Sequence, residues 1–376
     1  MKPAIVVVTY NRANSLRRLL NALSIASYTT VDIPLVISID FQNSENHKEV
    51  LKTASDFNWQ FGEKRIIEHK ENLGLRKHIL GCGNLSEEFG SIIMLEDDIY
   101  VSPQFYDYSV QMLAYYENKE YVAGISLYKH LRNVNVNRTF TPQNNGYDVF
   151  LMQFAQSWGQ CWSVRMWKDF YSWYLENQSL VPEAEVPTFV SSWPESSWLK
   201  YFIKYVIKKD KYFVYPYESL STNFTDTGTH NKVANNVSQV PLQLDSKKYN
   251  IPTIEAAIKY DAFFERQDLE TVLSIESLCV DLYGAKKQNE GVKYLLSMKH
   301  LPYEIVGSYG LNFRPHELNV ILKNNGNDIF LYDTSISKQD NPAVVNNQIY
   351  KQLFYDYSLL TRKNVLHFLI KKILKL

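Results

Sequence analysis

Three consecutive carboxylates are the residues of this sequence best suited to chemistry. Glu96, Asp97 and Asp98 directly follow the apolar residues 92–95. A continuous apolar run of this kind is typical of a strand buried on both faces. Three acids at its end repel one another unless a cation neutralises them, and carboxylate oxygens suit Mg²⁺ or Mn²⁺, with a substrate diphosphate completing the coordination. A metal site is one interpretation, and a solvated acidic turn before Pro103 is the other.

The elements that position these acids are predicted by alternating apolar runs and helical patterns. Strands are expected at residues 3–10, 35–40, 64–68 and 91–96, with helices between them. Ser15 or Asn14 is expected to cap the first helix. This order predicts an α/β fold, with a mostly parallel sheet and helices on both faces.

The turn after the first strand contains neither a GxGxxG nor a GxxxxGK[ST] loop. A dinucleotide site and a P-loop NTPase are therefore both disfavoured. Asp40 ends the second strand as Asp98 follows the fourth, and ligands of open α/β sheets bind at the carboxyl ends of the strands. Asp40 is thus a candidate acceptor for a nucleoside's hydrogen bonds, or simply a turn residue.

Basic side chains open the helix that begins near Arg76 and Lys77. Cations are unfavourable at a helix N-terminus, so they are candidates for binding an anion such as a diphosphate. A solvated basic helix start is the alternative. His230 lies in a hydroxyl-rich loop and is a candidate phosphate contact or metal ligand, or a solvated histidine.

Two aromatic segments follow later in the chain. Trp158 and Trp162 flank Gly159, an arrangement that suits a floor for a sugar ring, although an aromatic core gives the same pattern more often. Trp193 and Trp198 flank Glu195. A carboxylate beside aromatic walls has a raised pKa and can serve as a general base; an acid in the first turn of a helix is the simpler interpretation.

The bulk composition indicates a globular protein. The 376 residues are 45% hydrophobic with a formal net charge of +0, which excludes a polyelectrolyte that binds nucleic acid through its overall charge. Three widely spaced cysteines favour a reducing compartment without zinc or disulfides. Residues 4–8 are too short for a signal peptide, and no apolar run approaches a membrane span. We therefore expect a cytoplasmic protein.

The last stretch, residues 362–376, contains five cations and no acids, with apolar residues near one helical face. This pattern predicts a helix on an anionic surface, so that the protein would associate peripherally with the inner face of the cytoplasmic membrane. A partner-docking helix and a last core helix remain alternatives. Upstream, residues 253–283 are predicted to be helical, and residues 319–322 and 329–332 to form a hairpin.

Four motifs together resemble a known family. Residues 7–13 (Val-Val-Thr-Tyr-Asn-Arg-Ala), the strand ending at Asp40, residues 71–75 (Glu-Asn-Leu-Gly-Leu) and residues 95–98 (Leu-Glu-Asp-Asp) occur in the order found in glycosyltransferases of the GT-A fold. The sequence is similar to the family-2-like bacterial sugar transferases and to the α-mannosyl β-1,2-N-acetylglucosaminyltransferase that begins complex N-glycan branching. The resemblance covers roughly residues 3–235.

The resemblance implies a GT-A catalytic domain at residues 1–235. Residues 236–376 match no part of the family, and their own patterns predict a smaller accessory region, mixed but mainly helical, that ends in the basic amphipathic helix. The resemblance implies metal-dependent, inverting transfer of a sugar from a nucleotide-diphosphate sugar, with UDP preferred, to an acceptor hydroxyl of a glycan. The basic C-terminal stretch in addition suits a lipid-linked acceptor, so that bacterial surface polysaccharide synthesis is a further hypothesis. Asp98 would contact Mn²⁺ or Mg²⁺, and Glu195 would be the base. The donor would be held by Thr9, Tyr10, Asn11, Arg12, Asp40, Asn72, Arg76, Glu96, Asp97 and His230. Trp158, Gly159, Trp162, Trp193 and Trp198 would face the sugar or the acceptor.

Two other classes of function compete with this hypothesis. A sugar-nucleotide nucleotidyltransferase would use a similar sheet and metal, but is expected to carry a glycine-rich loop after the first strand, and residues 9–15 contain no glycine. A non-catalytic glycan-binding protein would not need three adjacent acids.

Overall fold

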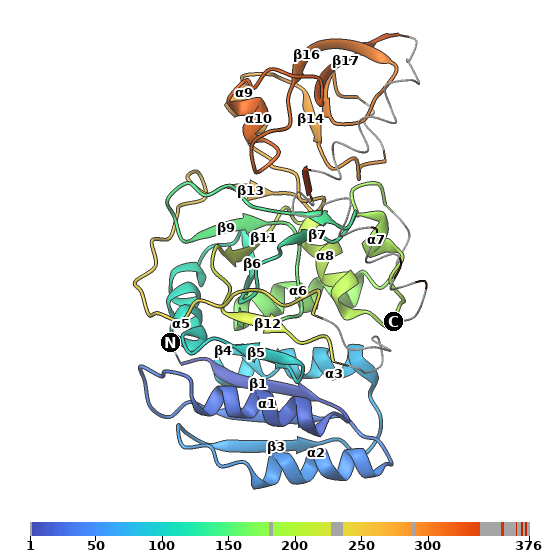
Figure 1. Cartoon of the computed structure of the whole chain (residues 1–376). Helices are drawn as coiled ribbons and strands as arrows, with labels where there is room; N and C mark the ends of the chain where they lie inside the picture. Colours follow the sequence, from blue (N-terminus) through green and yellow to red (C-terminus); the bar gives the residue numbers. More distant parts are fainter. Residues whose placement is uncertain are drawn as a thin grey trace. The chain divides into compact units, whose positions relative to one another are not determined.

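The computed structural model describes residues 2–179, 183–226, 236–287 and 291–338, together with Tyr355, Asp356, Leu366, Ile370 and Ile373. The chain divides into two compact units. Unit 1 comprises residues 1–130 and 144–262, and unit 2 comprises residues 131–143 and 263–376. Each unit is described by itself (Figure 1).

The first half of unit 1 alternates strands and helices as the sequence predicts. β1 and β2 are apolar, largely β-branched and completely buried, which is the environment of a central parallel strand. The elements in order are β1 (Ala4–Thr9), α1 (Ala13–Ser24), β2 (Leu35–Ile39), α2 (Glu45–Asp56), β3 (Lys64–Glu68), α3 (Gly74–Gly83), α4 (Ser86–Phe89) and β4 (Ser91–Glu96).

The second half of unit 1 contributes further strands to the same sheet, more helices, and the two strands β5 and β12, which pair separately. They are β5 (Ile99–Val101), α5 (Phe105–Tyr116), β6 (Val122–Ser126), β9 (Val149–Met152), β10 (Gln160–Ser163), α6 (Val164–Glu176), α7 (Thr188–Ser191), α8 (Trp198–Lys208), β11 (Tyr212–Pro216), β12 (Ser221–Asn223) and β13 (Lys259–Tyr260).

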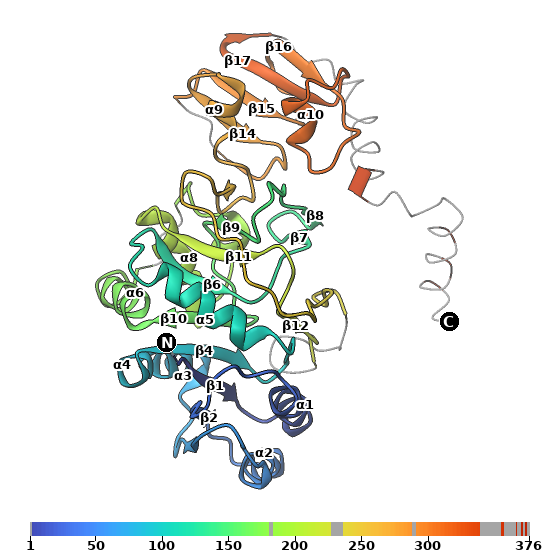
Figure 2. The ribbon, with the colours of Figure 1, turned by 90° about the vertical axis from the view of Figure 1, so that its left-hand side faces the viewer.

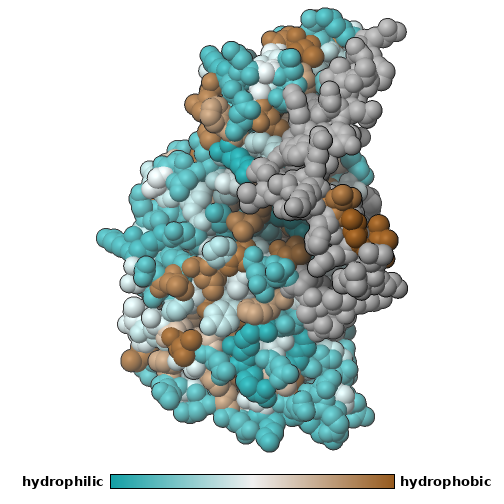
Figure 3. Space-filling model, in the orientation of Figure 1, coloured by the Kyte–Doolittle hydropathy of each residue, from teal (hydrophilic) through white to brown (hydrophobic). Residues whose placement is uncertain are grey.

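The large sheet has nine strands in the order β13-β9-β11-β6-β10-β4-β1-β2-β3. β1, β2, β3 and β4 are mutually parallel, and β10, β9 and β13 run against the remaining strands. Helices α1 and α2 cover one face, while α3, α4, α6 and α8 cover the other (Figure 2). The predicted α/β fold with a mostly parallel sheet is therefore confirmed. The surface over α1 and α2 is largely hydrophilic, as expected for their solvent sides (Figure 3).

The direction of the sheet reverses beside β4. β10 pairs with β4 in antiparallel register, so that Gln160 lies opposite Met94 and Ser163 opposite Ser91. On its other edge β4 pairs in parallel with β1. The start of β10 and the end of β4 therefore lie at the same edge of the sheet.

A separate two-stranded ladder joins two distant parts of unit 1. β5 pairs with β12 in antiparallel register, with Ile99 opposite Asn223. Just beyond the ladder, the backbone N–H of Phe224 donates to the carbonyl of Asp98 at 3.0 Å. Pairing of these strands brings the residues after β12 beside the acids after β4.

Serine side chains cap several helices, but not α1. Ser44 accepts a hydrogen bond from His47 N at 3.2 Å to begin α2, and Ser163 accepts one from Met166 N at 3.3 Å to begin α6. α1 has no side-chain cap. The predicted cap by Ser15 or Asn14 is wrong, because the Ser15 hydroxyl donates to a carboxylate of another segment, 2.7 Å away.

The described part of unit 2 is organised around a four-stranded sheet in the order β14-β15-β17-β16. Its core contains Leu269, Val280, Leu296 and Leu331 among other apolar side chains. The elements are β7 (Arg132–Asn133), β8 (Arg138–Thr139), α9 (Leu269–Leu273), β14 (Leu278–Asp281), β15 (Tyr294–Ser297), β16 (Tyr303–Tyr309), α10 (Leu318–Ile321) and β17 (Ile329–Ser337).

Two predictions for the C-terminal part are wrong. Residues 253–283 are not one helix, because residues 259–260 pair with β9, and Ser274, at φ 55°, ends α9 in the left-handed region. The expected hairpin is also absent, because residues 318–321 form a helical turn and β17 pairs with β15 and β16 instead. The prediction that this region is mainly helical therefore does not match the described part of unit 2.

The predicted basic helix at residues 362–376 falls mostly outside the described residues. Of those described, Leu366, Ile370 and Ile373 are helical and exposed. Over the described ranges, no helix combines the length and the apolar character that a membrane crossing requires.

Candidate active site

A cavity of about 340 Å³ opens at the carboxyl ends of β1, β2 and β4. This is the edge at which open α/β sheets bind their ligands. The cavity collects nine of the residues predicted from the sequence, namely Thr9, Tyr10, Asn11, Arg12, Asp40, Asn72, Glu96, Asp97 and Asp98. It is also lined by Val8, Gly74, Leu75, His78 and Asp226.

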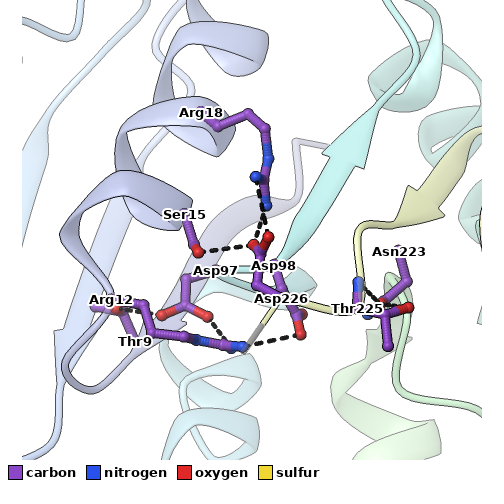
Figure 4. A network of polar contacts seen from close by, with 9 residues as sticks. All are labelled: Thr9, Arg12, Ser15, Arg18, Asp97, Asp98, Asn223, Thr225 and Asp226. Carbon is purple, nitrogen blue, oxygen red and sulfur yellow. Dashed lines mark hydrogen bonds and ion pairs between the residues drawn. The ribbon is translucent and has the colours of Figure 1, made fainter. Parts of the chain in front are cut away.

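The acids after β4 are held by residues that follow β1. The Thr9 hydroxyl donates to Asp97 Oδ2 at 2.7 Å. The Arg12 guanidinium donates to Asp98 Oδ2 at 3.1 Å and also pairs with Asp97 Oδ1 (Figure 4). Because β1 and β4 are adjacent and parallel, their ends place these side chains together. Asp98 Oδ1 is buried and, among the described residues, has no hydrogen-bond partner.

The local electrostatics reflect an excess of negative charge. Removal from water, followed by the charge of Asp98, raises the pKa of Glu96 to about 8. The same two causes raise the pKa of Asp97 to about 6, although Arg12 opposes them. Burial by itself would lower the pKa of Arg12, but the neighbouring carboxylates outweigh it and raise that pKa. Burial and the neighbouring acids therefore favour protonation of Glu96 and Asp97, and Arg12 does not fully offset this for either group.

Asp226 is a residue of the cavity that the sequence analysis missed. Its carboxylate accepts a hydrogen bond from Ser15 Oγ at 2.7 Å and forms an ion pair with Arg18, both on α1 (Figure 4). The Arg18 guanidinium in turn lies 3.9 Å from the centre of the Phe224 ring. The segment after β12 is thereby fixed against α1. The hydroxyl-rich sequence around Asp226 was noted, but only the β5–β12 pairing brings it to the cavity.

Asp40 contributes mainly to the shape of the cavity wall. Its Oδ1 accepts from Phe41 N at 2.9 Å and Leu73 N at 2.8 Å, and its Oδ2 accepts from Gly74 N at 3.1 Å. Gly74 has φ +72°, a conformation that favours glycine. Asp40 therefore stabilises the turn that begins α3, as the interpretation of Asp40 as a turn residue predicts. It also lines the cavity.

His78 also lines the cavity and was not predicted as a site residue. Its Nε2 lies 2.8 Å from Ser38 Oγ. Burial lowers the pKa of His78 to about 4, against an opposing contribution from Asp40, so the ring is neutral near pH 7. Among the described residues that line the cavity, Arg12 is consequently the one positive charge, facing Asp40, Glu96, Asp97, Asp98 and Asp226.

Arg76 and Glu195 are hydrogen-bonded to each other, but neither residue lines the cavity. The Arg76 guanidinium donates to the Glu195 carbonyl at 2.8 Å and to the Tyr201 hydroxyl at 2.9 Å. The Glu195 residue is exposed. Because Gly74 and Leu75 of the same helix α3 line the cavity, this contact links the segment of Glu195 to the helix at its edge.

The tryptophans divide into buried and partly exposed side chains. Trp162 is fully buried and Trp198 is 2% exposed, and both pack against Phe202. Neither residue lines the acidic cavity, so the aromatic-core alternative describes these two tryptophans. Trp158 and Trp193 are partly exposed. Gly159, at φ +94°, is buried, and a Cβ there would approach Leu127 and Ser221 to 3.1 Å. His230 lies outside the described residues.

The residues of the cavity fit a divalent cation on two observations. Asp98 Oδ1 is a buried carboxylate oxygen without a partner among the described residues, and the lining acids far outnumber the single guanidinium. Oxygen donors of this kind are those that Mg²⁺ and Mn²⁺ prefer. Within the described ranges no three acid, histidine or cysteine side chains are already grouped as a ligand set, and Arg12 occupies two of the carboxylate oxygens.

Comparisons with known proteins find similarity at the level of structure alone. No protein-family model matches the sequence, and neither does any curated protein. Two solved structures of Staphylococcus aureus TarS residues 1–349 share 11% identity with the chain. One covers 59% of this chain and 60% of that chain with a TM-score of 0.39, and the other, in complex with UDP-GlcNAc, covers 61% and 60% with a TM-score of 0.40.

A third solved structure is the mannosyltransferase PcManGT from Pyrobaculum calidifontis in complex with GDP-Man and Mn²⁺. It shares 13% identity, and the match covers 44% of this chain and 46% of that chain with a TM-score of 0.31. The chain thus spans less than two thirds of the length of each of these structures.

Proposed function

We propose that this protein is a glycosyltransferase that moves a sugar from a nucleotide-diphosphate sugar, with UDP preferred, to an acceptor hydroxyl. The observation that carries the proposal is the acidic cavity at the ends of β1, β2 and β4, with an Asp98 oxygen that has no partner within the described part of the chain. So acidic a cavity repels a diphosphate, and accepts one only together with a cation that both can share. Mn²⁺ or Mg²⁺ at Asp98 satisfies this requirement.

In this proposal, each residue of the cavity has its own role in binding the donor. Asp98 holds the cation, which would stabilise the charge that develops on the leaving diphosphate. Thr9 orients Asp97 through its 2.7 Å hydrogen bond, so that the acid pair keeps one geometry. The turn from Tyr10 to Arg12 and the wall built by Asp40 and Asn72 enclose the nucleoside. Asp226 closes the cavity from the segment after β12.

Single-displacement transfer with inversion needs one base that takes the acceptor's proton. Glu195 is proposed for this role. Its segment is joined to the helix at the edge of the cavity through Arg76, and its exposure leaves the carboxylate open to an incoming acceptor. The partly exposed Trp158 and Trp193 are proposed to contact the acceptor or the donor sugar.

The acceptor is proposed to be a glycan or a lipid-linked saccharide of bacterial surface polysaccharide synthesis. The cationic stretch at residues 362–376, in which Leu366, Ile370 and Ile373 are exposed, supports association with an anionic membrane surface. Cytoplasmic location at the inner face of the membrane is part of the same proposal.

The proposal is tested by thermal unfolding with UDP, UDP-GlcNAc and GDP-mannose, each with and without Mn²⁺. A ligand that binds only the folded protein stabilises it by about 2.7 kcal/mol at a concentration of 100 times its Kd. We expect a nucleotide-sugar to raise the midpoint in a Mn²⁺-dependent way, and Asp98→Asn, which removes a charge at constant size, to abolish that rise. Glu49→Ala, an exposed acid on α2, is the matched control and should behave like the wild type.

The donor that stabilises the protein is then incubated with Mn²⁺, and release of its nucleoside diphosphate is measured. Transferase activity predicts this release. Formation of a nucleotide-sugar from a sugar phosphate and a nucleoside triphosphate would instead identify a nucleotidyltransferase. Nucleotide binding that is indifferent to both Mn²⁺ and Asp98→Asn would contradict the proposal.

A further inference from the structure

The Arg12 guanidinium contacts the carboxylates of Asp97 and Asp98, which are the groups that a bound cation would use as ligands. Asp97 and Asp98 have four carboxylate oxygens. Arg12 contacts Asp97 Oδ1 and Asp98 Oδ2, and Thr9 contacts Asp97 Oδ2 (Figure 4). Of the four oxygens, Asp98 Oδ1 alone has no hydrogen-bond partner among the residues that the structure describes. The guanidinium is therefore the counter-ion of this acid pair in the ligand-free protein.

A divalent cation and this guanidinium compete for the negative charge of Asp98. Both are positive, and both require the lone pairs of the same carboxylate within a mostly buried site, where Asp98 is 8% exposed. Repulsion between two cations that share one buried carboxylate is only weakly screened. Binding of the cation must therefore weaken at least the contact between Arg12 and Asp98.

Arg12 has a second partner available within the same cavity once it leaves Asp98. It follows β1 directly, and its side chain is 23% exposed, so it is less constrained than the acids that it contacts. A planar guanidinium fits a phosphate group as well as it fits a carboxylate, because both accept its paired N–H donors. Arg18, by comparison, is fixed by Asp226 and by the Phe224 ring.

We propose that Arg12 is an exchangeable internal counter-ion, which a divalent cation displaces from Asp98 and which then pairs with the diphosphate of the donor. The inference rests on the proposed function and adds an order of events to it. The acid pair stays neutralised before the cation arrives, and the donor meets a site that already holds the cation and a free guanidinium. Removal of Arg12 must then have opposite effects on the cation and on the nucleotide.

Mn²⁺ binding without nucleotide is measured by the electron paramagnetic resonance signal of free Mn²⁺, in the wild type, Arg12→Gln, Arg12→Lys and Arg17→Gln. UDP affinity is measured by calorimetry at saturating Mn²⁺. Arg17 is the matched control, because it is an exposed arginine of α1 that contacts Asn14 and Thr53 and not the acids. Circular dichroism and the thermal midpoint establish that each variant is folded.

Arg12→Gln should bind Mn²⁺ about tenfold more tightly than the wild type, the scale of one charge-assisted hydrogen bond, and UDP about tenfold more weakly. Arg12→Lys, which keeps the charge but cannot bridge both carboxylates, should bind Mn²⁺ with intermediate affinity, and it carries the test if Arg12→Gln does not fold. Arg17→Gln should match the wild type.

Three results separate this inference from the proposed function. If the wild type binds Mn²⁺ but neither Arg12 variant binds it more tightly, the counter-ion role is wrong and the transferase proposal stands. If Arg17→Gln tightens Mn²⁺ binding as much as Arg12→Gln, the effect is long-range charge alone, and the displacement is also wrong. If the wild type binds neither Mn²⁺ nor UDP, the proposed function itself fails.

Discussion

At the scale of single residues, the cavity is organised by how completely each carboxylate is already satisfied. Asp40 accepts three backbone N–H groups, and Asp226 is paired with Arg18 and Ser15. Acids whose oxygens are already hydrogen-bonded in this way stabilise the wall of the cavity and are poor candidates for binding a cation or accepting a proton. Asp98, with one oxygen that has no described partner, and the exposed Glu195 differ from them. These two residues are the best candidates for cation binding and for proton transfer.

Glu195→Gln is predicted to abolish transfer, by at least about 100-fold, while UDP affinity stays unchanged. The amide keeps the size of the side chain but cannot accept the acceptor's proton, and the contact to Arg76 uses the backbone carbonyl, which the substitution retains. Turnover with a saccharide acceptor and calorimetry with UDP and Mn²⁺ measure the two quantities. Glu185→Gln, an exposed acid of the preceding segment, is the control. Undiminished turnover of Glu195→Gln would remove this residue from the mechanism.

At the scale of elements, an aromatic block holds α6 and α8 against the sheet. Trp162 on β10 stacks on Phe202 of α8 at 5.7 Å between ring centres and also contacts Trp167 of α6 at 4.9 Å. Phe170 and Phe202 stack at 4.0 Å. These four aromatic side chains therefore pack two helices onto the sheet.

Trp162→Ala is predicted to lower the free energy of unfolding by about 3–5 kcal/mol, because it leaves a large void in this block. Trp158→Ala should lower it by less, because Trp158 is partly exposed and its ring is placed edge-on to Tyr128 at 4.6 Å. Denaturant unfolding measures both. If Trp158 contacts a sugar, its substitution should also raise the KM for donor or acceptor, whereas an unchanged KM would assign it a packing role only.

The first half of the sheet could be predicted from the sequence because its signals are local. Buried strands such as β2 and β4 are largely apolar runs, and acids follow directly at their ends. Asp226 could not be found in this way, because its place depends on β5 pairing with β12, which lies over 100 residues further along the chain. Residues 253–283 illustrate the same limit, since pairing with β9 overrides their helical pattern.

At the scale of the whole molecule, the even balance of 40 basic and 40 acidic residues conceals local asymmetry. The cavity gathers acids, and residues 362–376 carry five cations and no acid. Charge is thus distributed unevenly along the chain, and the net value of +0 describes neither region.

Removal of residues 362–376 is predicted to abolish binding to vesicles of phosphatidylglycerol and phosphatidylcholine. Each cation near an anionic surface contributes about 1 kcal/mol, so the full chain should sediment with these vesicles and be released at high salt. Vesicles of phosphatidylcholine alone are the lipid control, and Mn²⁺-dependent UDP binding shows that the shortened chain is folded. Equal sedimentation of both chains would contradict the membrane role of this stretch.

The reversal of direction between β4 and β10 has a consequence for how this sheet edge can change. Gln160 lies opposite Met94, so the residues just before β10, including Trp158 and Gly159, lie at the edge of the sheet that bears Glu96. These two segments are far apart in the sequence. A shift of β10 by one residue would exchange its two faces and pull Trp162 out of the core, so the register is fixed. The loop before β10 can therefore vary in length and sequence while the carboxylates after β4 keep their positions.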